Sequence, residues 1–119
     1  MSAIKLRAAD KAALEGVKLL LDSFPEPVPT IKQLCRKSGL NADKLKRGFK
    51  LLYGEPPYRY MLLRKMEKAK KMLCETELSV NEIAWELGYE HASNFCIQFK
   101  KVVGCRAGEW RQQQHSKSI

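Results

Sequence analysis

The sequence predicts an all-α fold, and three observations support this prediction. Apolar residues recur every three or four positions over most of the chain, which is the period of an amphipathic helix. No stretch alternates between apolar and polar residues with period two, so we expect no sheet. One pattern also occurs twice, about fifty positions apart: Gly39, Leu45, Phe49, Lys50, Gly54, Pro57 and Tyr60, then Gly88, Phe95, Phe99, Lys100, Gly104, Ala107 and Trp110.

A first amphipathic helix is predicted near the N-terminus. Asp10 is a plausible N-cap, and Leu14, Val17 and Leu21 follow at helical spacing. Three prolines at positions 25, 27 and 29 then forbid continuation of the helix, because proline lacks the N–H that a helix interior needs. We therefore expect one helix followed by a stiff connector.

A helix-turn-helix motif is predicted over residues 30–53. Thr30 and Gln33 have the spacing of a capping box, which opens a short helix that Gly39 ends. Asn41 can cap the next helix after a three-residue turn. In that helix an inward stripe is expected until Gly54, made of Leu45, Phe49 and Leu52. Two short helices joined by a tight glycine turn define the motif.

A long helix is predicted over residues 56–74. Prolines are tolerated in a first helical turn, and the chain has two of them there, Pro56 and Pro57. One face of the helix is apolar, with Leu62, Met66, Ala69 and Leu73. The other face is expected to be basic, with Arg59, Arg64, Lys65, Lys68 and Lys71, which we interpret mainly as solvated charges.

A second helix-turn-helix motif is predicted over residues 79–103. A capping box, Ser79 and Glu82, opens it, Gly88 marks its turn, and Gly104 ends its second helix. The inward stripe of that helix is Phe95, Phe99 and Val102. A final short helix should place Trp110 against the body of the domain, before a polar tail at residues 115–119.

The composition indicates a small, strongly basic domain. Hydrophobic residues make up 45% of the 119 residues, which is typical of a globular protein. There are 22 Lys and Arg residues against 13 Asp and Glu residues, which gives a formal net charge of +9. This excess favours nucleic acid as a partner, although an ordinary solvated surface can also be basic. No run approaches the roughly 18 apolar residues of a membrane span, and no signal peptide opens the chain, so we expect a cytoplasmic protein with no membrane partner.

The sequence offers little support for catalysis or metal binding. The four cysteines form no CxxC pair and have no nearby histidine at metal-ligand spacing, so reduced thiols and no metal site are expected. The two histidines have no fixed acid or thiol partner, and no glycine-rich phosphate loop or nucleophile elbow is present. We therefore expect no catalytic residue, no enzyme activity and no cofactor.

The outward face of each motif's second helix follows from helical geometry. If Leu45, Phe49 and Leu52 point inward, an outward face remains at positions i, i+3, i+4 and i+7. In the first motif this face carries Asp43, Lys46, Arg47 and Lys50. The matching residues fifty positions later are Ser93, Cys96, Ile97 and Lys100.

These motifs resemble the C-terminal DNA-binding domain of AraC-type (AraC/XylS family) transcriptional regulators. The resemblance covers about Leu14 to Arg111 and is densest from Ser79 to Gly104. It rests on Ile31, Leu34, Gly39, Leu45, Phe49, Lys50, Gly54, Tyr60, Arg64, Ala69, Leu73, Val80, Glu82, Ile83, Ala84, Gly88, Tyr89, Phe95, Phe99, Lys100, Gly104 and Arg111. It implies one DNA-binding domain over residues 8–114, with seven helices and two homeodomain-like three-helix units joined by the long helix. The implied function is sequence-specific binding of a double-stranded operator by two recognition helices in successive major-groove segments, which regulates transcription.

The two outward faces predict that the second motif reads fewer base pairs than the first and serves partly to contact phosphates. Lys46 and Arg47 are long donors suited to guanine, whereas Cys96 and Ile97 offer mainly methyl contacts, as to thymine. The resemblance adds Ala92 and Asn94 near the groove. We therefore expect base reading by Asp43, Lys46, Arg47, Ala92, Ser93, Asn94, Cys96 and Ile97, and phosphate contacts by Lys44, Lys50, His91, Lys100 and Lys101.

Several alternatives remain open at this point. Asp43 can complement the helix dipole instead of accepting a hydrogen bond from cytosine N4, and Ile97 can be covered by an absent partner. The lysines can be solvated charges, His91 can cap the second recognition helix, and Trp85 can pack between motifs or face a partner. The alternative function is a protein-interaction module that contacts RNA polymerase or a co-regulator.

Two departures from the family pattern qualify the resemblance. Ala107 stands where the family usually has proline, which leaves the start of the final helix less fixed. No sensor or dimerisation domain precedes the helices, so we expect a domain cut from a longer regulator. A small stand-alone regulator is the alternative.

Overall fold

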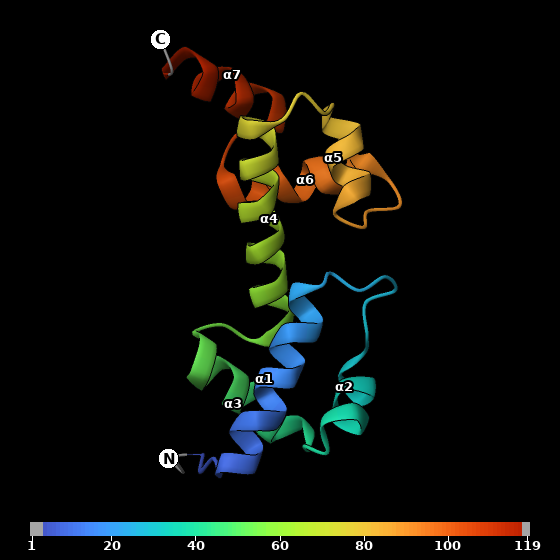
Figure 1. The fold of residues 1–119 in the computed structure, drawn as a ribbon, viewed down its shortest axis with the longest axis vertical. Helices are drawn as coiled ribbons and strands as arrows, with labels where there is room; N and C mark the ends of the chain where they lie inside the picture. Colours follow the sequence, from blue (N-terminus) through green and yellow to red (C-terminus); the bar gives the residue numbers. More distant parts are fainter. Residues whose placement is uncertain (1–3, 118–119) are drawn as a thin grey trace. The chain divides into compact units, whose positions relative to one another are not determined.

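The computed structural model describes residues 4–117, and its described part consists of helices without strands. Figure 1 shows seven of them, in the order α1 Ala8–Asp22, α2 Ile31–Ser38, α3 Ala42–Tyr53, α4 Pro57–Glu75, α5 Val80–Glu86, α6 Ala92–Val103 and α7 Ala107–Lys117. The all-α prediction is confirmed. Helix α7 continues into the segment that the sequence suggested as a polar tail, and residues 118–119 of that tail lie outside the described residues.

The chain divides into two compact units, one ending at Leu62 and the other beginning at Leu63. Helix α4, the longest at 19 residues, contributes its first turns to one unit and the remainder to the other. The first unit contains α1, α2 and α3, and the second contains α5, α6 and α7. Each unit therefore holds one helix-turn-helix pair.

The helix termini of the first unit follow the capping chemistry of the sequence. The Thr30 hydroxyl accepts from the backbone N–H of Gln33 at 3.1 Å, and the Gln33 side chain accepts from the N–H of Thr30 at 2.9 Å. The Asn41 side chain accepts from the N–H of Lys44 at 2.8 Å. Both caps are confirmed. Gly39 ends α2 with a φ of 75°, a left-handed conformation that glycine adopts without a steric penalty.

The core of the first unit is built around Phe49. Its ring meets the rings of Tyr53 and Tyr60 edge-on, with centroids 4.7 and 5.3 Å away. Fully buried side chains come from α1, α2 and α3, and from the start of α4: Leu14, Leu21, Leu34, Leu45, Phe49 and Pro57. The hydrophobic stripes read from the sequence therefore meet in one core, as amphipathic faces do in a helical bundle.

Two expectations for the first unit are wrong in detail. Asp10 is not the N-cap of α1, because the helix begins at Ala8 and the Asp10 carboxylate accepts from the backbone N–H of Arg7 at 3.0 Å. Leu52 is 37% exposed, because Gly48 and Phe49 hold the inward positions of α3 and Tyr53 packs against the core at its end. The bond of Asp10 is local, to a residue three positions away, whereas the packing of Tyr53 depends on other residues of the core.

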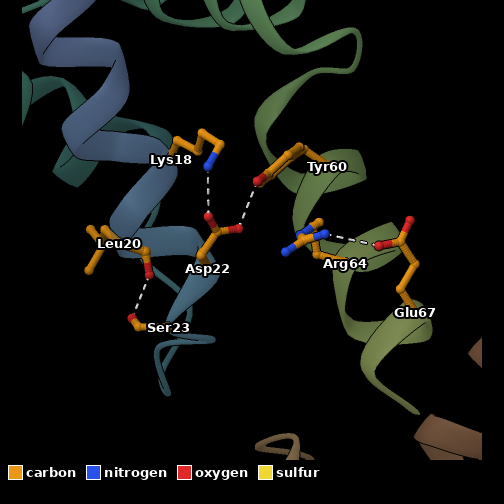
Figure 2. Close-up of polar contacts among 7 residues, drawn as sticks. All are labelled: Lys18, Leu20, Asp22, Ser23, Tyr60, Arg64 and Glu67. Carbon is orange, nitrogen blue, oxygen red and sulfur yellow. Dashed lines mark hydrogen bonds and ion pairs between the residues drawn. The ribbon is translucent and has the colours of Figure 1, made fainter. Parts of the chain in front are cut away.

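A polar cluster joins the end of α1 to the start of α4 (Figure 2). The Asp22 carboxylate accepts from the Tyr60 hydroxyl at 2.7 Å and pairs with the Lys18 ammonium at 3.1 Å. Burial first, and then the hydrogen bond to Asp22, raises the pKa of Tyr60. The hydrogen bond to Asp22 also raises the pKa of Lys18. Beyond the boundary of the first unit, Arg64 and Glu67 form an ion pair within α4, with a 3.0 Å distance between nitrogen and oxygen.

The second unit repeats this construction with different side chains. Ser79 and Glu82 form the predicted capping box at the start of α5. The buried stripe of α6 is Phe95 and Phe99, and the Phe99 ring meets the Trp110 ring edge-on at 6.4 Å. Arg111 joins α7 to α4. Its guanidinium donates to the carbonyl of Leu73 at 3.0 Å, near the C-terminus of α4, where helix carbonyls lack partners within the helix.

One residue of the predicted basic face is buried in the second unit. Lys65 is only 6% exposed, and its ammonium lies 4.7 Å from the centroid of the Tyr89 ring. A cation over an aromatic face is attracted by the ring electrons, which offsets part of the cost of burial. Burial raises the pKa of Tyr89 to about 12, so its hydroxyl stays protonated and donates to the Gln98 side chain. The expectation of a solvated Lys65 is therefore wrong.

Candidate nucleic-acid interface

Helices α3 and α6 occupy equivalent places in the two units. Both have 12 residues, and both end at a left-handed glycine, Gly54 with φ 86° and Gly104 with φ 98°. The turn before α3 spans Gly39–Asn41, whereas the turn before α6 spans Leu87–His91 and is two residues longer. The repeat therefore preserves the helix that follows each turn but changes the turn itself.

The outward face of α3 is polar and accessible. Because Leu45, Gly48 and Phe49 are buried, the predicted set of four side chains remains outside the core, and all are exposed: Asp43, Lys46, Arg47 and Lys50. Arg47 Nη1 lies 3.2 and 3.4 Å from the two Asp43 carboxylate oxygens, one helical turn away. Both side chains are largely solvated, so such a pair contributes little stability and can exchange for another partner.

Lys44 differs from its neighbours on α3. Its ammonium lies 3.0 Å from the Asp10 carboxylate, so it is directed toward α1. The backbone N–H of Arg7, and then the Lys44 side chain, lower the pKa of Asp10. This ion pair fixes the N-terminal turn of α3 beside the first turn of α1.

The outward face of α6 is less polar. Ala92 is half-buried, and the other predicted residues of this helix are exposed: Ser93, Asn94, Cys96, Ile97, Lys100 and Lys101. Ile97 is 63% exposed, so a large apolar side chain stands on this outward face. His91 occupies the N-cap position, but its side chain makes no capping hydrogen bond, so the capping interpretation of this side chain is wrong.

A hollow of about 510 Å³ adjoins the outward face of α6. It is lined by Val80 at the start of α5, by Cys96, Ile97 and Lys100 of α6, and by residues 106–109 at the start of α7. The sequence reasoning missed Arg106, whose guanidinium lies 4.0 Å from the Glu109 carboxylate. The repeat gives no signal for this residue, because the first copy has Pro56 at the matching position.

Two other classes of site receive no support from the part of the chain that the structure describes. Across residues 4–117 no group of three His, Cys, Asp or Glu side chains is placed to hold a metal ion. In the same range no helix is both long and apolar enough to cross a membrane.

The known proteins that this chain is similar to are helix-turn-helix transcriptional regulators. The sequence profile of a helix-turn-helix domain matches residues 34–113. The uncharacterised HTH-type transcriptional regulator YdiP of Escherichia coli K12 is 36% identical over 84 residues, which is 71% of this chain and 28% of that protein. The regulator YtdP of Bacillus subtilis is 33% identical over 73% of this chain and 11% of its own length. The chain thus spans less than a third of these two relatives.

Solved structures of the same kind share the fold. The C-terminal domain of the two-component response regulator yesN from Fusobacterium nucleatum has a TM-score of 0.72 and 31% identity, over 84% of this chain and 98% of that domain. The DNA-binding domain of AdpA, solved in complex with a target DNA, has a TM-score of 0.77 over 88% of this chain and 95% of its own. At 17% identity the AdpA likeness concerns the fold alone.

Proposed function

Because the chain belongs to the AraC-type helix-turn-helix domains of transcriptional regulators, we propose that it binds double-stranded DNA sequence-specifically and thereby regulates transcription. The recognition helices are α3 and α6. The observation that carries the proposal is their repetition: two helices of equal length, each anchored by a buried phenylalanine, present exposed faces after a short turn. The formal net charge of +9 supplies the attraction to phosphate.

The proposed readers differ between the two helices. Arg47 and Lys46 donate to guanine, Asp43 either accepts from cytosine or holds Arg47, and Lys50 meets phosphate. On α6, Ile97 and Cys96 contact thymine methyl groups with Ser93, Asn94 and Ala92 nearby, while Lys100, Lys101 and His91 meet phosphates. Lys44 is a weaker candidate than the sequence suggested, because it already pairs with Asp10.

The proposal is tested by selecting bound sequences from a random duplex pool and measuring their affinity at several salt concentrations. We expect a preferred sequence with two conserved blocks. We also expect log affinity to fall by about 0.9 per phosphate contact for each tenfold rise in salt. Binding that is indifferent to both sequence and salt would exclude DNA recognition and favour a protein-interaction module.

A protein partner forms a second part of the proposal. Trp85 is 58% exposed on α5, and a large exposed aromatic side chain is typical of a contact surface. RNA polymerase or a co-regulator is the partner that fits a regulator of transcription. We also propose a cytoplasmic location, because a regulator of transcription acts in the compartment that holds its DNA.

The apolar face of α6 predicts a dependence on the thymine methyl group. Replacing thymine by deoxyuridine in the block read by α6 removes one methyl group per base, which costs about 0.8 kcal/mol, or roughly fourfold in affinity, for each buried methyl. The same replacement in the block read by α3 should have a smaller effect. Titration of paired duplexes that differ only in these methyl groups measures both values.

The variant that tests this dependence is Ile97→Ser, which replaces the apolar side chain by a small polar one. This variant should show a smaller difference in affinity between the thymine and deoxyuridine duplexes, with Cys96 left as the remaining methyl contact. An unchanged methyl preference in Ile97→Ser, or stronger base discrimination in the α6 block than in the α3 block, would contradict the proposed division of labour.

A further inference from the structure

A basic surface that no motif accounts for lies where α1 begins. Lys5, Arg7 and Lys11 fall within seven residues of one another, and all three are exposed. Asp10 stands among them, but its carboxylate pairs with Lys44 and accepts from the Arg7 backbone. The three cations therefore remain as a local excess of positive charge, and the next acidic residue of α1 is Glu15, further along the helix. We call residues 5–11 the N-terminal arm.

The N-terminal arm is packed against the recognition helix α3. The Leu6 side chain lies against Gly48, where a Cβ atom would come within 3.1 Å of Leu6 Cδ2. The same Cβ atom would come within 3.0 Å of Leu14 Cδ1, and Lys44 reaches Asp10 one turn earlier on α3. Gly48 therefore allows the start of α1 to approach α3 closely, and Figure 1 shows these two helices side by side.

The arm covers Gly48 on the buried side of α3, and the ion pair between Lys44 and Asp10 brings it to the edge of the outward face. Lys44, which touches the arm through Asp10, is three residues before Arg47, and residues three apart are neighbours on a helix surface. Cations at the side of a groove-reading helix are positioned for the sugar-phosphate backbone that borders the groove, not for base edges. Long, exposed lysine and arginine side chains suit such contacts because they need no fixed approach angle.

We infer that the N-terminal arm binds the phosphates of the DNA strand that flanks the groove segment read by α3, with Lys5, Arg7 and Lys11 as the contacts. The inference rests on the proposed function and extends it to a surface outside both helix-turn-helix motifs. Phosphate contacts add affinity and fix the register of the protein on the duplex, and they do not choose its sequence.

The test compares the whole chain with the triple variant Lys5→Gln, Arg7→Gln, Lys11→Gln on a duplex of about 25 base pairs recovered from the random pool, and on a scrambled duplex of the same composition. We expect the slope of log affinity against log salt to become less steep by about 0.9 per contact, or about 2.7 for three contacts. The affinity ratio between the two duplexes should stay unchanged.

The variant should fold, because Arg7 caps α1 through its backbone N–H rather than through its side chain. Helical circular dichroism and a melting curve verify this. The matched control Lys5→Arg, Lys11→Arg keeps the charges and should keep the slope.

If the unmodified chain binds with a steep salt slope and the triple variant has the same slope, the arm does not contact phosphates. The proposed function then stands without this contact. A changed sequence ratio in the triple variant would also overturn the arm as a phosphate contact. If the unmodified chain binds DNA with neither steep salt dependence nor sequence preference, the proposed function fails together with the arm. A sequence preference without steep salt dependence overturns the phosphate contacts of the arm alone.

Discussion

Arg47→Ala is expected to lower the affinity for the selected duplex by about 1 to 3 kcal/mol, which is roughly 5- to 150-fold, and to remove the preference at one base pair. Arg47 is exposed on the outward face of α3, and its planar guanidinium can donate two parallel hydrogen bonds to guanine. Its Nη1 pairs with the Asp43 carboxylate, a solvated contact weak enough for DNA to displace. Titration against duplexes that carry each of the four base pairs at every position of the α3 block measures the loss.

The control Arg47→Lys separates charge from shape. Lysine keeps the positive charge but lacks the planar fork, so this variant should keep the salt slope of the unmodified chain while losing the base preference. The equivalent change on α6, Ile97→Ala, should cost less because it removes only apolar contact. An Arg47→Ala variant that weakens binding to all sequences equally would assign Arg47 to a phosphate instead of a base.

Local chemistry explains why much of the fold was predictable. The capping pairs Thr30 with Gln33 and Ser79 with Glu82 act within one helical turn, so the sequence identifies them directly. Gly54 and Gly104 end α3 and α6 in a left-handed conformation that most residues avoid. The repeat strengthens each prediction, because the same local signals appear twice in the same order.

The parts that were missed depend on tertiary contacts. The Asp10 carboxylate, which accepts locally from Arg7, also pairs with Lys44, more than thirty positions away in the sequence. Lys65 is buried, and its ammonium lies over the ring of Tyr89, which stands in the turn before α6. No periodicity in the sequence of α1 or α4 encodes such partners. Helical periodicity identifies a face, but the neighbouring elements decide which residues at its edge are covered.

The candidate site was predictable in a similar way. The outward residues Asp43, Lys46, Arg47 and Lys50 follow from the buried stripe of the same helix, and their exposure agrees with that geometry. Arg106 and the N-terminal arm lie on other elements, and only packing brings them beside α6 and α3. Surfaces assembled from several elements are therefore where sequence reasoning loses residues, even when the helix at their centre is identified.

Phe99→Ala is expected to destabilise the second unit by about 3 to 5 kcal/mol, because it removes a fully buried ring and leaves a cavity. The Phe99 ring contacts the rings of Phe95 and Trp110, with centroids 5.8 and 6.4 Å away, so its loss weakens the attachment of α7 to α6. The free energy of unfolding of a small domain is only about 5 to 15 kcal/mol in total. Urea unfolding measures the overall loss, and amide hydrogen exchange locates it.

The matched variant Phe49→Ala makes the same change in the first unit, and the comparison tests whether the two units open separately. Phe99→Ala should reduce exchange protection in α5, α6 and α7 more than in α1, α2 and α3, and Phe49→Ala should show the reverse. The reason is that each ring contacts aromatic partners only within its own unit among the described residues. Equal loss of protection in all helices for both variants would mean that α4 couples the units into one cooperative structure. In that case the two recognition helices would be lost together, whereas separate opening leaves α3 folded and able to bind its half of the duplex when α6 is disordered.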